Sequence, residues 1–416
     1  MTSKHKNIIT LFLILLFVSS FYTKSMTADE WVEDIDFLAN KLPELHKNLF
    51  FNINEVNFNK EIEELKADLE NLEDIDIALR ITEIFSDIGD SHTGINIHGY
   101  ISKYYPVFFQ KFGSDYFVVA AHSEYSGLIG TRLKLINGQD IETVRDKMKS
   151  IIVAENNAAV GYRIQDYLNL PELLEYTQLI DDKVTYTFDT TVGLIEFSPD
   201  EYSINELSER MIQNFDYQPG IAYRNASQLF WHQFLEDEKI LYFQYNQCWS
   251  RELEERKTGK DADYLPSFIN IVTEMLQTLE NRDVEKLVID MRHNSGGSSV
   301  QGTAFAQILE QLEKKPEVYV VIGNRTFSSA IINAIQFRKY NDAILIGEAT
   351  RGKPNHFGEV KTFDLPNSNL SVQYSTNYFR FMEDDPDSLY PDITVETNYY
   401  DFVNGIDTVL EKIKEL

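Results

Sequence analysis

The chain has 416 residues and a net charge of −28, from 38 basic and 66 acidic side chains. The hydrophobic fraction of 43% excludes a disordered chain, and the length predicts two or three domains. The excess of acidic residues repels phosphate backbones, so nucleic-acid binding is not expected. The single cysteine, Cys248, excludes an intrachain disulfide and a cysteine-rich metal site, and its strand-like surroundings predict a buried apolar role.

The N-terminus has the pattern of a secretory signal. Lys4 and Lys6 precede a short apolar run over residues 8–18, and small residues follow it. We expect residues 1–25 to be a signal peptide or an N-terminal anchor, with residues 8–22 as the segment that would enter a membrane. The protein is therefore expected to be exported, as an extracellular, cell-envelope or membrane-anchored protein.

Two regions of different character follow. Apolar residues at helical spacing predict an N-terminal helical region over residues 29–94. Residues 95–200 are β-rich, with strands expected at 105–109, 116–121 and 132–136. The dipeptide at 137–138 is Asn-Gly, which favours a tight turn, and a helix is expected from Ile141. This order of strand, turn and helix is similar to a small PDZ-like module.

From residue 225 to 416, apolar strands alternate with amphipathic helices, which predicts an α/β fold with a parallel sheet. A single amphipathic helix is expected at 402–416. The strands are expected at 240–245, 286–291, 318–322 and 343–347, with helices around 265–279 and 305–312 and at 328–337.

Three loops should meet at one edge of this sheet, because parallel strands end on the same side. The first loop carries the pair Gly296 and Gly297, and the third, over 348–356, carries Lys353. The second leads into the stretch NRTFSSAIINA, where Ser328 and Ser329 stand between a strand and a helix. A serine there can be a helix cap. Beside open glycine amides and a lysine, it can also be the nucleophile of an acyl transfer.

The motifs LVIDMRHNSGG, TFSSA and GEATRGK, in this order, resemble the tail-specific, or C-terminal processing, serine peptidase family. The resemblance covers roughly residues 235–400, and IGDSHT near residue 90 also fits. It implies a crotonase-like protease core in which Ser328 is the nucleophile and Lys353 the general base. Gly296 or Gly297, together with the Ser329 amide, would form the oxyanion hole.

The sequence departs from the family pattern at the base. Members of the family that use a Ser-Lys pair often carry a glutamine four residues after the lysine, and here that position is Phe357. Asn355 or His356 would have to replace it. A lysine also acts as a base at neutral pH only if burial lowers its pKa by several units.

Tricorn-type relatives take their base from a Ser-His pair, which Ser91 and His92 match, together with a distant glutamate. A histidine needs no large pKa shift to accept a proton. The base therefore stays open between Lys353 and His92. The candidate acids for the tricorn-type arrangement are Glu383, Asp384, Asp385 and Asp387.

The sequence thus predicts an exported serine endopeptidase that cleaves unfolded or C-terminal segments of polypeptides, without a cofactor. No metal site is expected, because His98, His122 and His232 lack metal-like spacing. The alternative is a non-catalytic binding protein for an apolar ligand or a peptide on the same core. An acyl-CoA enzyme is disfavoured, because coenzyme A is cytosolic and anionic. The residues that could line the apolar groove of a binding protein are Tyr242, Phe243, Tyr245 and Trp249.

Overall fold

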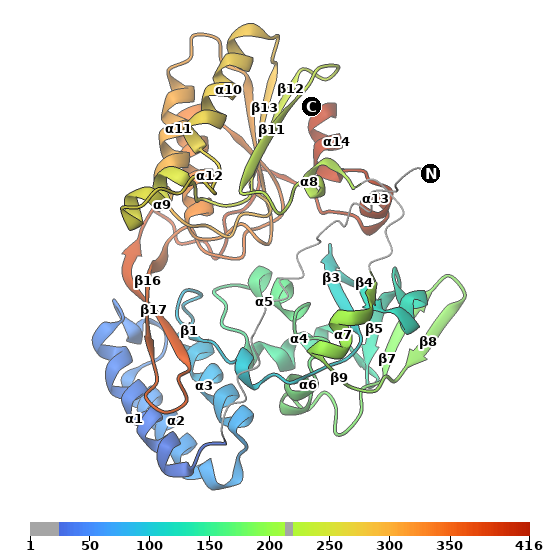
Figure 1. Cartoon of the computed structure of the whole chain (residues 1–416), viewed down its shortest axis with the longest axis vertical. Coiled ribbons are helices and arrows are strands. Elements are labelled where there is room, and N and C mark those ends of the chain that lie inside the picture. The colour runs from blue at the N-terminus through green and yellow to red at the C-terminus, as the bar shows by residue number, and fades with distance from the viewer. Residues whose placement is uncertain (1–24, 213–218) are drawn as a thin grey trace. The chain divides into compact units, whose positions relative to one another are not determined.

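The structure, a computed structural model, describes residues 25–212 and 219–416 (Figure 1). These residues form two compact units. The first unit contains the described residues of 215–354 and 388–416, and the second contains those of 17–214 and 355–387. The core expected over 225–416 is therefore interrupted, because residues 355–387 belong to the second unit. The signal or anchor expected at the N-terminus lies outside the described residues. Within the described ranges, no helix has the length and apolarity to cross a membrane.

The first unit is built on a six-stranded sheet with the order β11-β12-β13-β14-β15-β18. The strands from β12 to β18 are parallel, and β11 is antiparallel at one edge. This confirms the parallel sheet that the alternating pattern predicts. The strands are β11 (Phe230–Leu235), β12 (Ile240–Tyr245), β13 (Lys286–Asp290), β14 (Glu317–Ile322), β15 (Ile344–Gly347) and β18 (Ile393–Thr394).

Helices cover both faces of this sheet, which explains why β12 is buried along its whole length. On one face Phe243 contacts Phe268 and Phe305, which come from α10 and α11. On the other face Ile413 of α14 packs in one cluster with Tyr242. The helices are α8 (Ile221–Arg224), α9 (Arg251–Thr258), α10 (Phe268–Asn281), α11 (Val300–Glu310), α12 (Ser329–Asn341), α13 (Tyr399–Val403) and α14 (Thr408–Glu415).

Two sequence expectations about this unit are corrected. Tyr242, Phe243 and Tyr245 are completely buried, so they form the core and do not line an apolar binding groove. The single helix expected at 402–416 is wrong. It is divided into α13 and α14, because Gly405 adopts a φ of 72° and Asp407 caps a new helix by accepting two main-chain N–H groups.

The second unit begins with the predicted helical region, which consists of α1 (Ala28–Leu45), α2 (Glu55–Asp68) and α3 (Asp74–Ile88). A three-stranded sheet packs against these helices, with β17 (Ser371–Phe379) between β1 (Gly94–Ile95) and β16 (His356–Asp364). Asp34 of α1 is completely buried and accepts the N–H groups of Asn367 and Ser368, at the turn of the β16–β17 hairpin, at 2.8 and 2.9 Å. This hairpin was not expected from the residue pattern.

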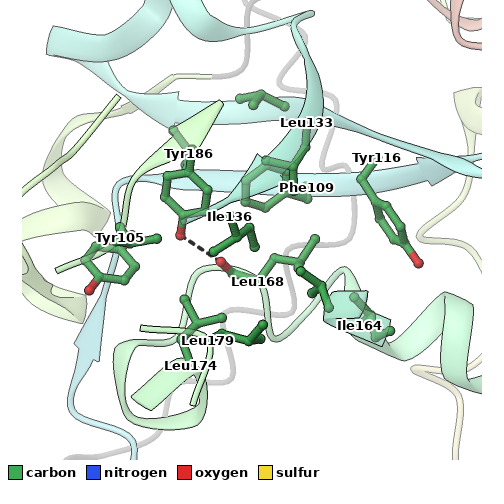
Figure 2. Close-up of a cluster of buried hydrophobic side chains, with 14 of the residues drawn as sticks. Tyr105, Phe109, Tyr116, Leu133, Ile136, Ile164, Leu168, Leu174, Leu179 and Tyr186 are labelled. Carbon is green, nitrogen blue, oxygen red and sulfur yellow. Dashed lines mark hydrogen bonds between the residues drawn. The ribbon is translucent and has the colours of Figure 1, made fainter. Parts of the chain in front are cut away.

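The β-rich module completes the second unit and has its own core (Figure 2). In it the Tyr186 hydroxyl donates to the Leu168 carbonyl oxygen at 2.7 Å. The strand at 132–136 and its tight turn are confirmed, with positive φ angles of 46° at Asn137 and 77° at Gly138. The strands are β2 (Lys103–Tyr104), β3 (Val107–Phe112), β4 (Asp115–His122), β5 (Arg132–Ile136), β6 (Gln139–Asp140), β7 (Tyr186–Thr190), β8 (Gly193–Phe197), β9 (Tyr202–Ser203) and β10 (Met211–Ile212), and the helices are α4 (Ile141–Met148), α5 (Asn157–Ile164), α6 (Pro171–Tyr176) and α7 (Ile204–Arg210).

Candidate functional site

Three loops meet at the edge of the six-stranded sheet where β13, β14 and β15 end, because these strands are parallel neighbours. The first two loops are joined by the Phe327 N–H, which donates to the Asn294 carbonyl oxygen at 3.1 Å. The second and third loops are joined by Asn324, whose Nδ2 donates to Glu348 Oε2 at 3.1 Å and to the Ala349 carbonyl oxygen at 3.3 Å. The hydrogen bonds therefore fix the loops that carry the predicted motifs against one another.

Ser328 stands at the junction of the second loop and α12, with a φ of 53° and a ψ of −125°. Glycine dominates this conformation, and a residue with a Cβ adopts it at a cost of about 1–3 kcal/mol. The Ser328 side chain makes no helix-capping hydrogen bond, and its hydroxyl bonds to no described residue of its unit. Ser328 therefore occupies the N-cap position of α12, but its side chain does not cap the helix. A strained serine on a strand-to-helix turn, with an open hydroxyl, is the arrangement that presents a nucleophile.

The glycine pair passes close to this serine. A Cβ on Gly296 would lie 2.9 Å from the Ser328 Cβ, and the φ angles of 104° at Gly296 and 131° at Gly297 favour glycine. The Gly296 N–H donates to Asn294 Oδ1 at 2.9 Å, and the Gly296 carbonyl accepts the Cys248 N–H at 2.9 Å. The hydrogen bonds of the fold therefore use Gly296 completely, which leaves Gly297 as the glycine whose amide can serve a ligand.

Two amides near Ser328, those of Gly297 and Ser329, make no hydrogen bond with any residue in the described ranges. Gly297 is exposed, and its carbonyl oxygen accepts the Ser329 hydroxyl at 2.9 Å, which ties the two residues together. Ser329 is the first residue of α12, where N–H groups have no partner within the helix and the helix dipole is positive. Two such donors can stabilise a negative charge that develops on an oxygen.

Lys353 lies on the third loop, which packs against the residue before Ser328. A Cβ on Gly352 would come within 2.7 Å of the Phe327 ring, and the Arg351 guanidinium lies 4.8 Å from the centre of that ring. Lys353 is partly buried, and its ammonium makes no hydrogen bond to the Ser328 hydroxyl. The loop contact thus brings the Lys353 segment to the Ser328 turn without joining the two side chains.

His92 lies in the second unit, next to the buried carboxylate of Asp90. Asp90 Oδ1 accepts the His92 main-chain N–H at 2.9 Å and lies 3.9 Å from the ring Nδ1. Asp90 Oδ2 accepts the Thr93 hydroxyl at 2.5 Å, the Ser375 hydroxyl at 2.6 Å and His46 Nε2 at 3.1 Å. One carboxylate therefore connects the end of α1, the turn that carries His92 and strand β17.

The groups around Asp90 keep it ionised. Burial by itself would raise the pKa of this carboxyl, but the hydrogen bond from His46, the electrostatic effect of His92 and the two hydroxyl donors lower it to about 2. The Asn48 N–H donates to His46 Nδ1 at 3.1 Å, so the His46 ring carries its proton on the Nε2 that faces Asp90. An ionised carboxylate beside an imidazole is the setting that orients a proton acceptor in serine hydrolases.

Ser91 and a second carboxylate complete these surroundings. The Ser91 hydroxyl oxygen accepts the Glu155 N–H at 3.0 Å. Asp90, His92 and Glu155 place one potential ligand atom each within 4.8 Å of one another, so these described residues are the ones that could hold a cation. Both oxygens of Asp90 already accept hydrogen bonds, so the carboxylates of Asp90 and Glu155 are equally suited to orient the His92 ring. We assign no metal to them.

Two residues expected to support the base have other contacts in the second unit. The Asn355 side chain accepts two main-chain N–H groups and donates to two carbonyl oxygens of residues 381–384, at 2.8 to 3.1 Å. Its amide therefore holds this segment in place, which is a structural role. The His356 ring stacks on the His92 ring, with centroids 5.4 Å apart. The candidate acids at 383, 384, 385 and 387 are all exposed.

Three residues of these sites, Asp90, Asn294 and His46, were not expected from the sequence. Asp90 and Asn294 stand inside the motifs IGDSHT and LVIDMRHNSGG, and a polar residue just before Ser-His or two residues before Gly-Gly is the signal that points to them. His46 gives no such signal, because it reaches Asp90 from the end of a helix that lies far away in the sequence.

No family model matches the chain, and no curated protein sequence matches it. Solved structures do. Mature CPAF complexed with lactacystin superposes with a TM-score of 0.64 at 12% identity, over 93% of this chain and 98% of that chain. The fold of this chain is that of CPAF. A second structure of mature CPAF has a TM-score of 0.64, also at 12% identity, over 94% of this chain and 97% of that one. The photosystem II D1 C-terminal processing protease, at 12% identity, covers 93% of this chain and 96% of its own, with a TM-score of only 0.38.

Proposed function

We propose that the protein is a serine-type endopeptidase and that Ser328 is its nucleophile. The Ser328 Oγ attacks the carbonyl carbon of a peptide bond, the C–N bond breaks, and the amine leaves with a proton. An ester between Ser328 and the acyl part remains, and water hydrolyses it and restores the hydroxyl. The observation that carries this proposal is the strained backbone of Ser328, whose hydroxyl caps nothing although it stands at the start of a helix.

The negative charge of the tetrahedral intermediate would be stabilised by the amides of Gly297 and Ser329. Both donate to no described residue, and the Ser329 hydroxyl, bonded to the Gly297 carbonyl oxygen, ties them together. Donors that are already in place need no reorganisation during the reaction, and removal of one such donor typically lowers kcat by about 10²–10³-fold.

The proposal includes two candidates for the general base. Lys353 belongs to the same unit as Ser328, and its loop packs against Phe327. His92 belongs to the second unit, and the ionised carboxylate of Asp90 stands next to it. The pH dependence separates the two candidates, since a histidine base loses activity as the pH falls through about 6.5, whereas a lysine base gains activity at higher pH.

Unfolded or C-terminal segments of polypeptides are the proposed substrates, on the basis of the family resemblance. The module over 95–200 would present such a segment by adding it to a sheet edge, as PDZ-like modules do. Strand β8 pairs only with β7 among the described strands, so its other edge offers main-chain groups for such an addition. Export is also part of the proposal and rests on the N-terminal signal pattern. An N-terminus shortened at about residue 25 in protein recovered from the cell envelope or the medium would support it.

The first test is labelling with a fluorophosphonate probe, which reacts with activated serines. Wild-type protein should be labelled and should cleave an unfolded protein substrate, and Ser328→Ala should do neither. Ser227→Ala, a change at an exposed serine of the same unit, is the matched control and should behave as wild type. Folded wild-type protein that takes up no probe and cleaves nothing would contradict the proposal.

The second test compares Lys353→Ala with His92→Ala across pH on the same substrate. The base variant should lose at least about 10²-fold in kcat, because general base catalysis contributes about 10²–10⁴-fold. If only His92→Ala is inactive and wild-type kcat/KM falls as the pH is lowered into the acidic range, the base is His92. If only Lys353→Ala is inactive and activity rises toward alkaline pH, it is Lys353.

A further inference from the structure

Asn294 connects the three chain segments that surround the open amides. It is completely buried, directly after β13 and its short turn. Its Nδ2 donates to the Tyr245 carbonyl oxygen at the end of β12, at 2.8 Å. Its Oδ1 accepts the Gly296 N–H at 2.9 Å, and its own carbonyl oxygen accepts the Phe327 N–H at 3.1 Å. A single side chain and its peptide group therefore join the neighbouring strand, the glycine loop and the residue before the proposed nucleophile.

The direction of the Gly297 amide depends on the two peptide groups on either side of Gly296, one held by Cys248 and the other by Asn294. A trans peptide is planar, so its C=O and N–H groups point in opposite directions. The Gly296 carbonyl points to the Cys248 N–H, 2.9 Å away, and the Gly297 N–H of the same peptide must therefore point away from Cys248. The bond from the Gly296 N–H to Asn294 fixes the preceding peptide in the same way. Gly296 is buried and Gly297 is exposed. This agrees with a Gly296 amide that holds the loop and a Gly297 amide that can bind a ligand.

We infer that Asn294 is a positioning residue of the oxyanion hole, which it shapes without touching the substrate. The inference rests on the proposed function of Ser328. Only a side chain with one donor and one acceptor at this place satisfies both the Tyr245 carbonyl oxygen and the Gly296 N–H. An apolar side chain leaves both groups without a partner in a buried site, and a carboxylate sets one of its oxygens against the Tyr245 carbonyl oxygen.

The test compares Asn294→Ala with Asn246→Ala. Asn246 is a matched control, because it is also buried, lies just after β12 and donates its Nδ2 to the Gln228 carbonyl oxygen at 2.9 Å, away from the glycine loop. With an unfolded protein substrate, Asn294→Ala should lower kcat by about 10²-fold or more, as the loss of an oxyanion donor does, and should change KM by less than about threefold. Asn246→Ala should change kcat and KM by less than about threefold each.

Asn294→Asp adds a pH signature that a purely structural role would not give. The introduced carboxyl can donate to the Tyr245 carbonyl oxygen only when it is protonated, and burial favours the protonated form. The ratio of the kcat of N294D to that of wild type should therefore rise as the pH is lowered from about 8 to about 6. A ratio independent of pH, or equal kcat losses in Asn294→Ala and Asn246→Ala, would overturn the inference. A change confined to KM would overturn it as well.

Hydrogen exchange of the peptide over residues 292–298 distinguishes this inference from the proposed function itself. Asn294→Ala should expose the Gly296 amide and speed its exchange, whereas Asn246→Ala should leave that exchange as in wild type. Unchanged exchange in Asn294→Ala refutes the positioning role even if the enzyme is active. If Asn294→Ala exchanges faster but wild-type protein neither reacts with the fluorophosphonate nor cleaves substrate, the loop contact is confirmed. Its catalytic role and the proposed function are then both refuted.

Discussion

Replacement of Ser328 by glycine should make the protein more stable while it abolishes activity. The residue is held at a φ of 53° and a ψ of −125°, which only glycine adopts without strain. The fold therefore stabilises at this position a conformation that serine resists. If the strain serves to present the hydroxyl, a glycine at this position should raise the stability and lower the activity.

The size of the effect follows from two opposing terms. Relief of the strained conformation contributes about 1–3 kcal/mol. Glycine also has more freedom in the unfolded chain than serine, and this reduces the gain by about 0.5–1 kcal/mol. We therefore expect Ser328→Gly to raise the free energy of unfolding by about 1 kcal/mol, which corresponds to about 2–4 °C in Tm for a domain of 150–250 residues.

Thermal unfolding followed by circular dichroism measures this difference, with two matched variants. Ser328→Ala also removes the hydroxyl but keeps the Cβ, so it should have the Tm of wild type within about 1–2 °C. Ser329→Gly places glycine at the first residue of α12 and removes the hydrogen bond to the Gly297 carbonyl oxygen, so it should lower Tm. A Ser328→Gly variant no more stable than Ser328→Ala would show that the backbone there is not strained.

Three further predictions concern buried residues. The pKa of Asp90 is lowered to about 2, so the stabilisation by its ionised carboxylate is present above pH about 4 and is lost as the pH falls toward 2. In urea unfolding, the free energy of unfolding of wild type should therefore fall by about 2 kcal/mol more than that of Asp90→Asn between pH 5 and pH 2. Parallel pH dependences of the two proteins would contradict this. Burial raises the pKa of the Cys248 thiol to about 12, so a disulfide reagent at pH 8 should modify it only after unfolding, and rapid modification of the native protein would be the contrary result. Gly302→Ala would place a Cβ 2.2 Å from Asn333 Oδ1 and should lower the free energy of unfolding by about 1–3 kcal/mol. Gly127→Ala is the control, because nothing lies within 4 Å of its Cβ, and it should leave Tm unchanged. Equal Tm values for the two variants would argue against tight packing of α11 on α12.

Elements whose residue pattern is local could be predicted without the structure. The strand at 240–245 is mostly apolar because both of its faces are covered, and its expected bounds agree with β12. The tight turn at Asn137 and Gly138 was predictable because few residue types accept its positive φ angles. Parallel strands then bring their C-terminal loops to one edge, so the loop that ends in Ser328 could be placed beside the glycine pair without coordinates.

The use of individual polar groups depends on how distant segments pack in the folded protein. The Gly296 N–H donates to Asn294, whereas the Gly297 N–H has no partner among the described residues. This difference depends on the direction of single peptide planes, which no residue pattern encodes. The contact of His46 with Asp90 joins residues 44 positions apart, and the β16–β17 hairpin completes the second unit although most of the chain around it belongs to the first. Sequence periodicity reports the face that an element buries, whereas hydrogen bonds between distant segments exist only once packing has brought those segments together.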